Sequence, residues 1–146
     1  MLKGISPLIS SDFLVTLHRM GHGDRIVLAD AFFPAYRFGL PVIAASGLKT
    51  TDLLAAILPL FTLDQYTDAP LTMMEAVPGD ELDPEVASSY ETIVRRSQPD
   101  RAHIRYVERF AFYEEASTSF AIVRTGSIVK YANLMLTKGV TPILEG

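Results

Sequence analysis

The chain has 146 residues, with nine glycines, nine prolines and no cysteine. This is the size of one domain, which buries roughly 70% of the surface that its unfolded form exposes. The lack of cysteine excludes disulfides, thiolate zinc sites and cysteine nucleophiles. The formal net charge of −4 argues against a nucleic-acid-binding protein, which needs clustered lysine and arginine to neutralise phosphates.

The sequence also predicts no membrane segment. The longest apolar run, 53–61, contains Pro59 and is far shorter than the ~20 residues of a membrane-spanning helix. Polar and helix-breaking residues interrupt the N-terminal segment where a signal peptide would be apolar, so we expect a cytoplasmic protein. Apolar residues make up 49% of the chain, slightly more than a small monomer usually has, and part of this surplus is expected to face another subunit.

Two hydrophobic periodicities alternate along the first half of the chain. Ser10 or Ser11 can cap a helix whose apolar residues recur at helical spacing up to Gly21. Pro59 is expected to kink or shorten the second helix. The predicted elements of this half are a helix from 11 to 20, strands over 26–29 and 41–45, and a helix from 50 or 51 to 61.

The second half continues the alternation. Asp83, Pro84 and Glu85 form a helix start, with an N-cap, a proline at the first position and an early acid. The predicted elements are strands over 71–77, 104–107, 120–123 and 134–136, with helices from 84 and over 108–116, and a turn at 125–126. Strands that alternate with helices predict an α/β sheet covered on both faces. Such sheets bind ligands beyond the carboxyl ends of their strands.

The first candidate residues flank the predicted strand 26–29. His22 stands between two glycines before this strand, and Asp30 follows its end. An imidazole with so little steric cover can reach a ligand, and it suits proton transfer near neutral pH. The alternative is a plain turn with an exposed His22. Asp30 either points into the crevice beyond the strand or forms a turn ahead of Pro34.

Further candidates lie in the last third of the chain. Arg109 carries five N–H donors that can form hydrogen bonds to two neighbouring hydroxyls at once. The aromatic residues that follow it can line a sugar face or, alternatively, belong to the core. Tyr131 and Asn133 would put a phenol and an amide on one face of an extended segment. Such a pair suits a polyol.

Several familiar sites are absent from the sequence. No glycine-rich dinucleotide motif follows the first strand, and there is neither a Walker loop nor a Gly-x-Ser-x-Gly elbow. The three histidines, His18, His22 and His103, lack metal-ligand spacing. We therefore expect no catalytic metal.

Six segments together resemble one family, the ribose pyranase / L-fucose mutarotase (RbsD/FucU) proteins, and within it the fucose branch. They occur in the same order as in that branch and extend over essentially the whole chain. The segments are residues 1–10, 20–24, 30–31 with 33–35, 109–113, 130–133 and 138–142. Phe32 and Tyr36 depart from the family pattern, which often has His or Asn at the first position and sometimes His at the second.

The resemblance implies a fold, an assembly and a chemistry. The fold would be a single three-layer α/β/α domain with a mixed sheet over residues 1–146, in a ring-shaped homo-oligomer that is commonly a decamer with sites near subunit boundaries. His22 would be the catalytic acid/base, and Asp30, Arg109, Tyr131 and Asn133 would hold the sugar. The implied reaction interconverts the α and β anomers of a monosaccharide, L-fucose, without a cofactor.

Other functions remain open from the residues. A non-catalytic sugar-binding or transport-accessory protein needs the same contacts to hydroxyls but no proton-transfer group, so His22 is the discriminating feature. A ribose pyranase would use the same chemistry on D-ribose, and the family's ribose branch tends to have a histidine where this chain has Arg109. A nucleotide-binding domain would need a phosphate cradle, which the sequence lacks.

Overall fold

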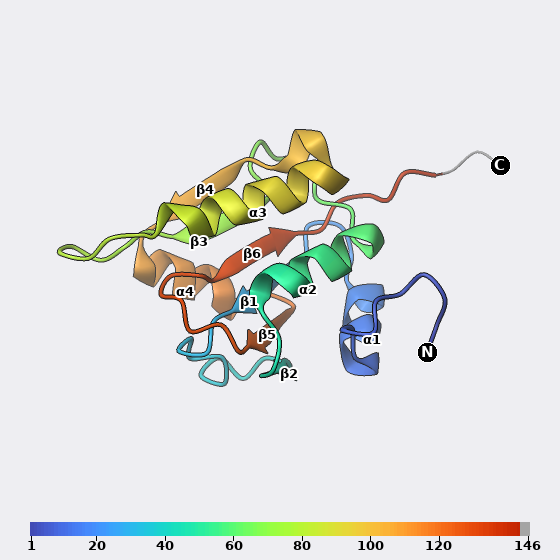
Figure 1. The fold of residues 1–146 in the computed structure, drawn as a ribbon, viewed down its shortest axis with the longest axis horizontal. Helices are drawn as coiled ribbons and strands as arrows, with labels where there is room; N and C mark the ends of the chain where they lie inside the picture. The colour runs from blue at the N-terminus through green and yellow to red at the C-terminus, as the bar shows by residue number, and fades with distance from the viewer. Residues whose placement is uncertain (144–146) are drawn as a thin grey trace.

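The computed structural model describes residues 1–143, so 144–146, the end of the predicted domain, lie outside the described residues. Its strands form one six-stranded sheet in the order β2-β5-β1-β6-β3-β4 (Figure 1). The strands are β1 (Arg25–Ala29), β2 (Val42–Ala45), β3 (Leu71–Met74), β4 (Ile104–Val107), β5 (Ala121–Thr125) and β6 (Leu134–Thr137). β6 runs antiparallel to β1 and β3, while the other neighbours are parallel. The sheet is therefore mixed, as expected.

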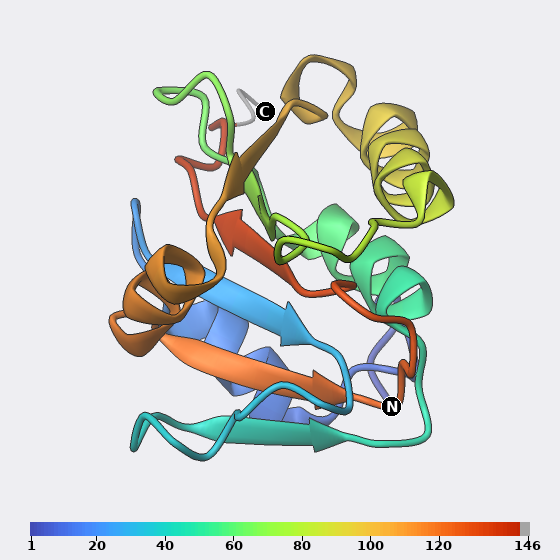
Figure 2. The same ribbon diagram turned by 90° about the vertical axis from the view of Figure 1, so that its left-hand side faces the viewer.

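Helices cover both faces of this sheet. They are α1 (Ser11–Arg19), α2 (Thr50–Ile57), α3 (Pro84–Ser97) and α4 (Arg109–Ser117). The first three pack on one face, and α4 lies on the other (Figures 1 and 2). The prediction of a single three-layer α/β/α domain is confirmed. Among residues 1–143, no helix combines the length and the apolar character that a bilayer crossing requires.

The helix boundaries follow the capping signals. The Ser10 side chain accepts a hydrogen bond from the Phe13 N–H, and the Asp83 side chain accepts one from the Glu85 N–H. Each cap satisfies a backbone donor that has no partner within its helix. α2 ends at Ile57 and continues as a short 3₁₀ turn, Leu58–Leu60. The prediction that Pro59 shortens this helix is confirmed.

Successive residues of each strand pack into two separate hydrophobic cores, one on each face of the sheet, because side chains alternate between the faces. In β1, Ile26 and Leu28 pack under α1, α2 and α3, whereas Val27 and Ala29 pack under α4. The segment 30–41 adds Phe33 and further apolar residues to the α4 side. Both faces are thus covered up to the ends of the strands.

Two predicted boundaries were wrong. The strand expected over 71–77 ends at Met74, because both of its neighbours end there: Met74 pairs with Val107, the last residue of β4, and Met73 pairs with Leu134, the first residue of β6. The strand expected over 120–123 spans Ala121–Thr125. Thr125 is held in the sheet by pairing with β2, rather than in a turn.

Candidate active site

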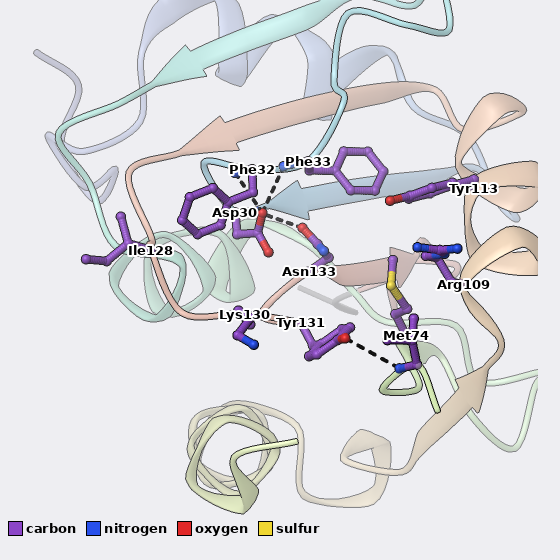
Figure 3. A pocket seen from close by; sticks show the side chains of 11 residues that line it. Asp30, Phe32, Phe33, Met74, Arg109, Tyr113, Ile128, Lys130, Tyr131 and Asn133 are labelled. Carbon is purple, nitrogen blue, oxygen red and sulfur yellow. Dashed lines mark hydrogen bonds between the residues drawn. The ribbon is translucent and has the colours of Figure 1, made fainter. Parts of the chain in front are cut away.

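A cavity of about 570 Å³ lies where β1 and β3 end and β6 begins (Figure 3). Its volume falls within the range of about 300–1,000 Å³ typical of small-molecule sites. The structure brings four of the five predicted site residues into its lining: Asp30, Arg109, Tyr131 and Asn133. The other lining residues are mostly apolar: Phe32, Phe33, Met74, Val77, Tyr113, Ile128 and Lys130. Two of them were noted in the sequence, Phe32 as a departure from the family pattern and Tyr113 among the aromatic residues that follow Arg109.

Asp30 is buried directly beyond the last residue of β1. Its Oδ1 accepts hydrogen bonds from the Phe32 and Phe33 N–H groups, both at 2.9 Å. Burial raises the pKa of the Asp30 carboxyl above its ordinary value of 3.8, although these two backbone donors act in the opposite direction. With Oδ1 committed to the backbone, Oδ2 is the oxygen that a ligand hydroxyl can reach.

Asn133 and Tyr131 reach the same cavity from the segment that leads into β6. The Asn133 Oδ1 accepts a hydrogen bond from the Asp30 N–H at 2.8 Å, which leaves its NH₂ group to donate elsewhere. Tyr131 has a φ of +59°, so the prediction of an extended segment at this residue was wrong. A left-handed residue reverses the local chain direction, yet both side chains still line the cavity.

Arg109 is the first residue of α4, and Glu108 caps this helix through the Phe110 and Ala111 N–H groups. The guanidinium carbon lies 4.5 Å from the centroid of the Phe110 ring. Its Nε is buried and has no hydrogen-bond partner among the described residues. A buried donor without a partner is costly. Because a sugar hydroxyl cannot touch an atom that is closed off from solvent, the terminal guanidinium nitrogens are the donors that Arg109 offers at this cavity.

His22 lies elsewhere, before the first residue of β1, and does not line this cavity. Because β1 has five residues and a strand rises about 3.3 Å per residue, roughly 16 Å of strand separates the two ends. The structure therefore divides the predicted site into two parts, with the sugar-binding candidates at one edge of the sheet and the histidine at the other.

His22 has its own partners at that second edge. Its Nε2 lies 3.2 Å from Oδ1 of Asp64, which is buried, and its ring packs against that of Tyr66, with the centroids 5.2 Å apart and the planes tilted by 49°. The same Asp64 oxygen accepts from the Tyr66 N–H at 3.1 Å. Sequence reasoning missed Asp64, which lies three residues after the end of the apolar run 53–61. The two residues are 42 positions apart in the chain, so their closeness depends on the fold.

Hydroxyl groups behind the cavity hold the strand ends in place. The Thr125 hydroxyl donates to the Ala29 carbonyl at 2.7 Å and lies 3.1 Å from the Thr50 hydroxyl. The buried Tyr90 hydroxyl donates to the Ala132 carbonyl. These bonds fix the backbone directly before Asp30 and directly before Asn133. Within residues 1–143, no group of three or more His, Cys, Asp or Glu side chains is placed to hold a metal ion.

The model of the RbsD / FucU transport protein family matches residues 3–141. This chain belongs to that family. Among its relatives, an L-fucose mutarotase of Actinobacillus pleuropneumoniae is 49% identical over 143 residues, which cover 98% of this chain and 99% of the relative.

Solved structures of family members have the same fold. A fucose mutarotase of Streptococcus pneumoniae in complex with L-fucose superposes with a TM-score of 0.91 at 40% identity, covering 97% of this chain and 100% of that one. FucU of Bifidobacterium longum superposes with a TM-score of 0.92 at 39% identity, covering 96% and 100% of the two chains.

Proposed function

We propose that this protein is a mutarotase that interconverts the α and β anomers of L-fucose. The observation that carries the proposal is the meeting of Asp30, Arg109, Tyr131 and Asn133 at one open cavity. These residues combine an acceptor, a fixed cation, a phenol and an amide, the mixture that a polyol needs. The family membership and the L-fucose mutarotase relative support the same reaction and sugar.

The reaction needs only proton transfer and a held substrate. The anomeric hydroxyl gives up its proton, the ring oxygen gains one, and the bond between C1 and the ring oxygen breaks to leave an open-chain aldehyde. Rotation about the C1–C2 bond then presents the other carbonyl face, and the ring closes on it. Positioned acid/base catalysis contributes about 10²- to 10⁴-fold, and fixing the hydroxyls contributes further.

In this proposal the cavity residues bind the sugar and His22 moves the proton. The Asp30 carboxyl accepts from one hydroxyl, the Asn133 amide donates to a second, and the terminal guanidinium nitrogens of Arg109 donate to a third. Asp64 acts through His22: its carboxylate, at 3.2 Å from Nε2, orients the ring and stabilises the imidazolium that forms when the ring takes up a proton.

The separation of His22 from the cavity favours catalysis across a subunit boundary. Phe32 and Ile128 at the cavity are 67% and 75% exposed, and Tyr66 beside His22 is 74% exposed. Burying such side chains against one another would stabilise an interface. We propose a cytoplasmic ring-shaped homo-oligomer, a decamer, in which the His22 edge of one subunit closes the cavity of the next.

Saturation-transfer proton NMR tests the reaction directly, with L-fucose, D-ribose, D-galactose and L-rhamnose as the panel. Exchange between anomers should exceed that in buffer, most strongly for L-fucose. The variant His22→Ala should bind the sugar but lose the exchange, and it should fold because this exposed side chain carries little packing. Exchange no faster than in buffer for all four sugars would refute the proposal.

The same experiment separates the two other candidates. D-Ribose exchanging faster than L-fucose would indicate a ribose pyranase. Sugar binding without any exchange would indicate a binding or transport-accessory protein. A full exchange rate in His22→Ala would show that another group shuttles the proton.

A further inference from the structure

We propose that Asp80, in the loop between β3 and α3, is the positioning residue for Tyr131. It would hold the phenol at the cavity and orient its hydroxyl so that a lone pair faces the sugar. This inference rests on the proposed function and deepens it, because it assigns a role to a residue that does not itself line the cavity.

The backbone conformation at Tyr131 has to be held by contacts from elsewhere in the chain. Among residues 1–143, Tyr131 is the only residue other than glycine with a positive φ, at +59°. A bulky side chain in this conformation is strained and persists only where surrounding contacts determine it. The hydrogen bonds of its side chain come from one loop, through the Asp80 carboxylate at 2.9 Å and the Val77 N–H at 3.4 Å.

The bond to Asp80 determines in which direction the Tyr131 hydroxyl donates its hydrogen. A phenol has one hydrogen to donate, and the carboxylate at 2.9 Å receives it. Hydrogen bonds from the Glu81 N–H, Lys130 and Tyr131 lower the pKa of Asp80, so this carboxyl stays ionised and acts only as an acceptor. The phenol oxygen also accepts from the Val77 N–H at 3.4 Å, and its remaining lone pair is left to accept a hydrogen bond from a sugar hydroxyl.

The loop is built to present this carboxylate. Gly79 has a φ of +88° after Pro78, and the Asp80 N–H closes the turn on the Val77 carbonyl at 3.0 Å. Proline followed by a left-handed glycine is typical of a type II turn. Oδ1 of Asp80 accepts from the Glu81 N–H at 2.9 Å, which directs Oδ2 toward the other partners.

That second oxygen holds two consecutive residues of the cavity wall. Besides the Tyr131 hydroxyl, Oδ2 of Asp80 accepts from Nζ of Lys130 at 3.0 Å. Figure 3 shows Lys130 and Tyr131 next to each other along the cavity. One carboxylate thus fixes a phenol and an ammonium group that both line the cavity.

A double-mutant cycle tests the proposal on the full chain. The variants are Asp80→Asn, Tyr131→Phe and the double variant, with Glu81→Gln as the matched control. The control removes one negative charge from the neighbouring exposed position of the same loop. Calorimetry measures the dissociation constant for L-fucose, NMR measures the exchange rate, and circular dichroism checks folding.

If Asp80 acts through the Tyr131 hydroxyl, the two substitutions will not be additive. We expect Asp80→Asn to weaken L-fucose binding and slow exchange about tenfold in the wild-type background, and less than about twofold in Tyr131→Phe. Glu81→Gln should stay within about twofold of wild type. Effects of Asp80→Asn that are equal in both backgrounds, or matched by Glu81→Gln, would overturn the proposal.

The outcomes also separate this proposal from the function on which it rests. A wild type that binds L-fucose without accelerating exchange refutes the mutarotase, while the cycle on the dissociation constant still decides the role of Asp80. A wild type that binds and exchanges L-fucose, with equal effects of Asp80→Asn in both backgrounds, refutes only the role of Asp80. A wild type that binds none of the sugars refutes both.

Discussion

At the scale of single residues, Asp30 has a cost to stability that its proposed role explains. Burial raises the pKa of its carboxyl, so the folded protein holds this proton more tightly than the unfolded chain does. The resulting stabilisation is complete below the unfolded value of about 3.8 and is lost as the pH rises through the folded value. Above that folded value the ionised carboxylate therefore opposes folding.

We predict that Asp30→Asn keeps or raises stability at pH 7 and loses sugar affinity. The amide oxygen can still accept from the Phe32 and Phe33 N–H groups, and the buried charge is gone. Urea unfolding should show an equal or higher midpoint at pH 7, with any advantage shrinking as the pH approaches 4. Calorimetry should show L-fucose binding weakened by about 1.5–3 kcal/mol. Unchanged affinity would reassign Asp30 to a structural role.

Asp64 is the second residue whose effect the geometry predicts. Asp64→Asn keeps an acceptor for the Tyr66 N–H but removes the charge beside His22. We expect the maximal exchange rate to fall about tenfold or more, with a smaller change in the sugar concentration at half-saturation, because a carboxylate that orients a histidine acts in the proton-transfer step. Asp68→Asn, at an exposed position of the same loop, is the control. Equal rates in the two variants would contradict this role.

At the scale of elements, the backbone directly after β5 packs closely against the backbone of the turn before α2. A Cβ at Gly126 would overlap the Ser46 carbonyl oxygen, whereas a Cβ at Gly47 would meet nothing within 4 Å. The Gly126 N–H also donates to the Leu48 carbonyl at 2.9 Å. The turn before α2 is thus in close backbone contact with the segment that leads from β5 toward Tyr131.

We therefore predict that Gly126→Ala destabilises the fold and Gly47→Ala does not. Because the Ser46 oxygen belongs to the backbone and cannot rotate away, the overlap should cost about 1–3 kcal/mol, as overpacking usually does. Thermal unfolding of the two variants measures the difference. A Gly126→Ala protein with the stability of Gly47→Ala would show that the turn yields without cost.

At the scale of the whole molecule, the two-part site predicts complementation between inactive subunits. His22→Ala and Arg109→Ala should each lose exchange on their own. If His22 serves the neighbouring cavity, dissociating the two variants together and reassembling them should leave about a quarter of the sites with both intact parts, as random mixing in a closed ring predicts. NMR exchange on the mixture is the measurement, and unmixed variants are the control. No recovery in mixed rings would place both parts in one subunit.

Assembly and activity should also be lost together. Dilution or mild denaturant is expected to abolish exchange in step with ring dissociation, before secondary structure melts. Light scattering and circular dichroism on the same samples follow the two events. A particle of about 16 kDa, the mass of one chain, with full exchange activity would contradict both the ring and its catalytic role.

Local patterns in the sequence determined the elements and the fold class. The caps at Ser10 and Asp83 and the proline at 59 depend on neighbours within a few residues, so the starts of α1 and α3 and the end of α2 were predictable. Short apolar runs that alternate with helical patterns likewise predicted all six strands. The candidate residues Asp30, Arg109, Tyr131 and Asn133 came from motif order and family resemblance.

Only the tertiary structure decided how these residues are grouped. The antiparallel insertion of β6 between β1 and β3 brings Asn133 to the Asp30 backbone, and the positive φ of Tyr131 turns its hydroxyl to Asp80. The separation of His22 from the cavity follows from its place before β1, while Asp30 lies after it. Contacts between residues 42, 51 or 103 positions apart depend on strand order and packing, which short-range patterns do not encode.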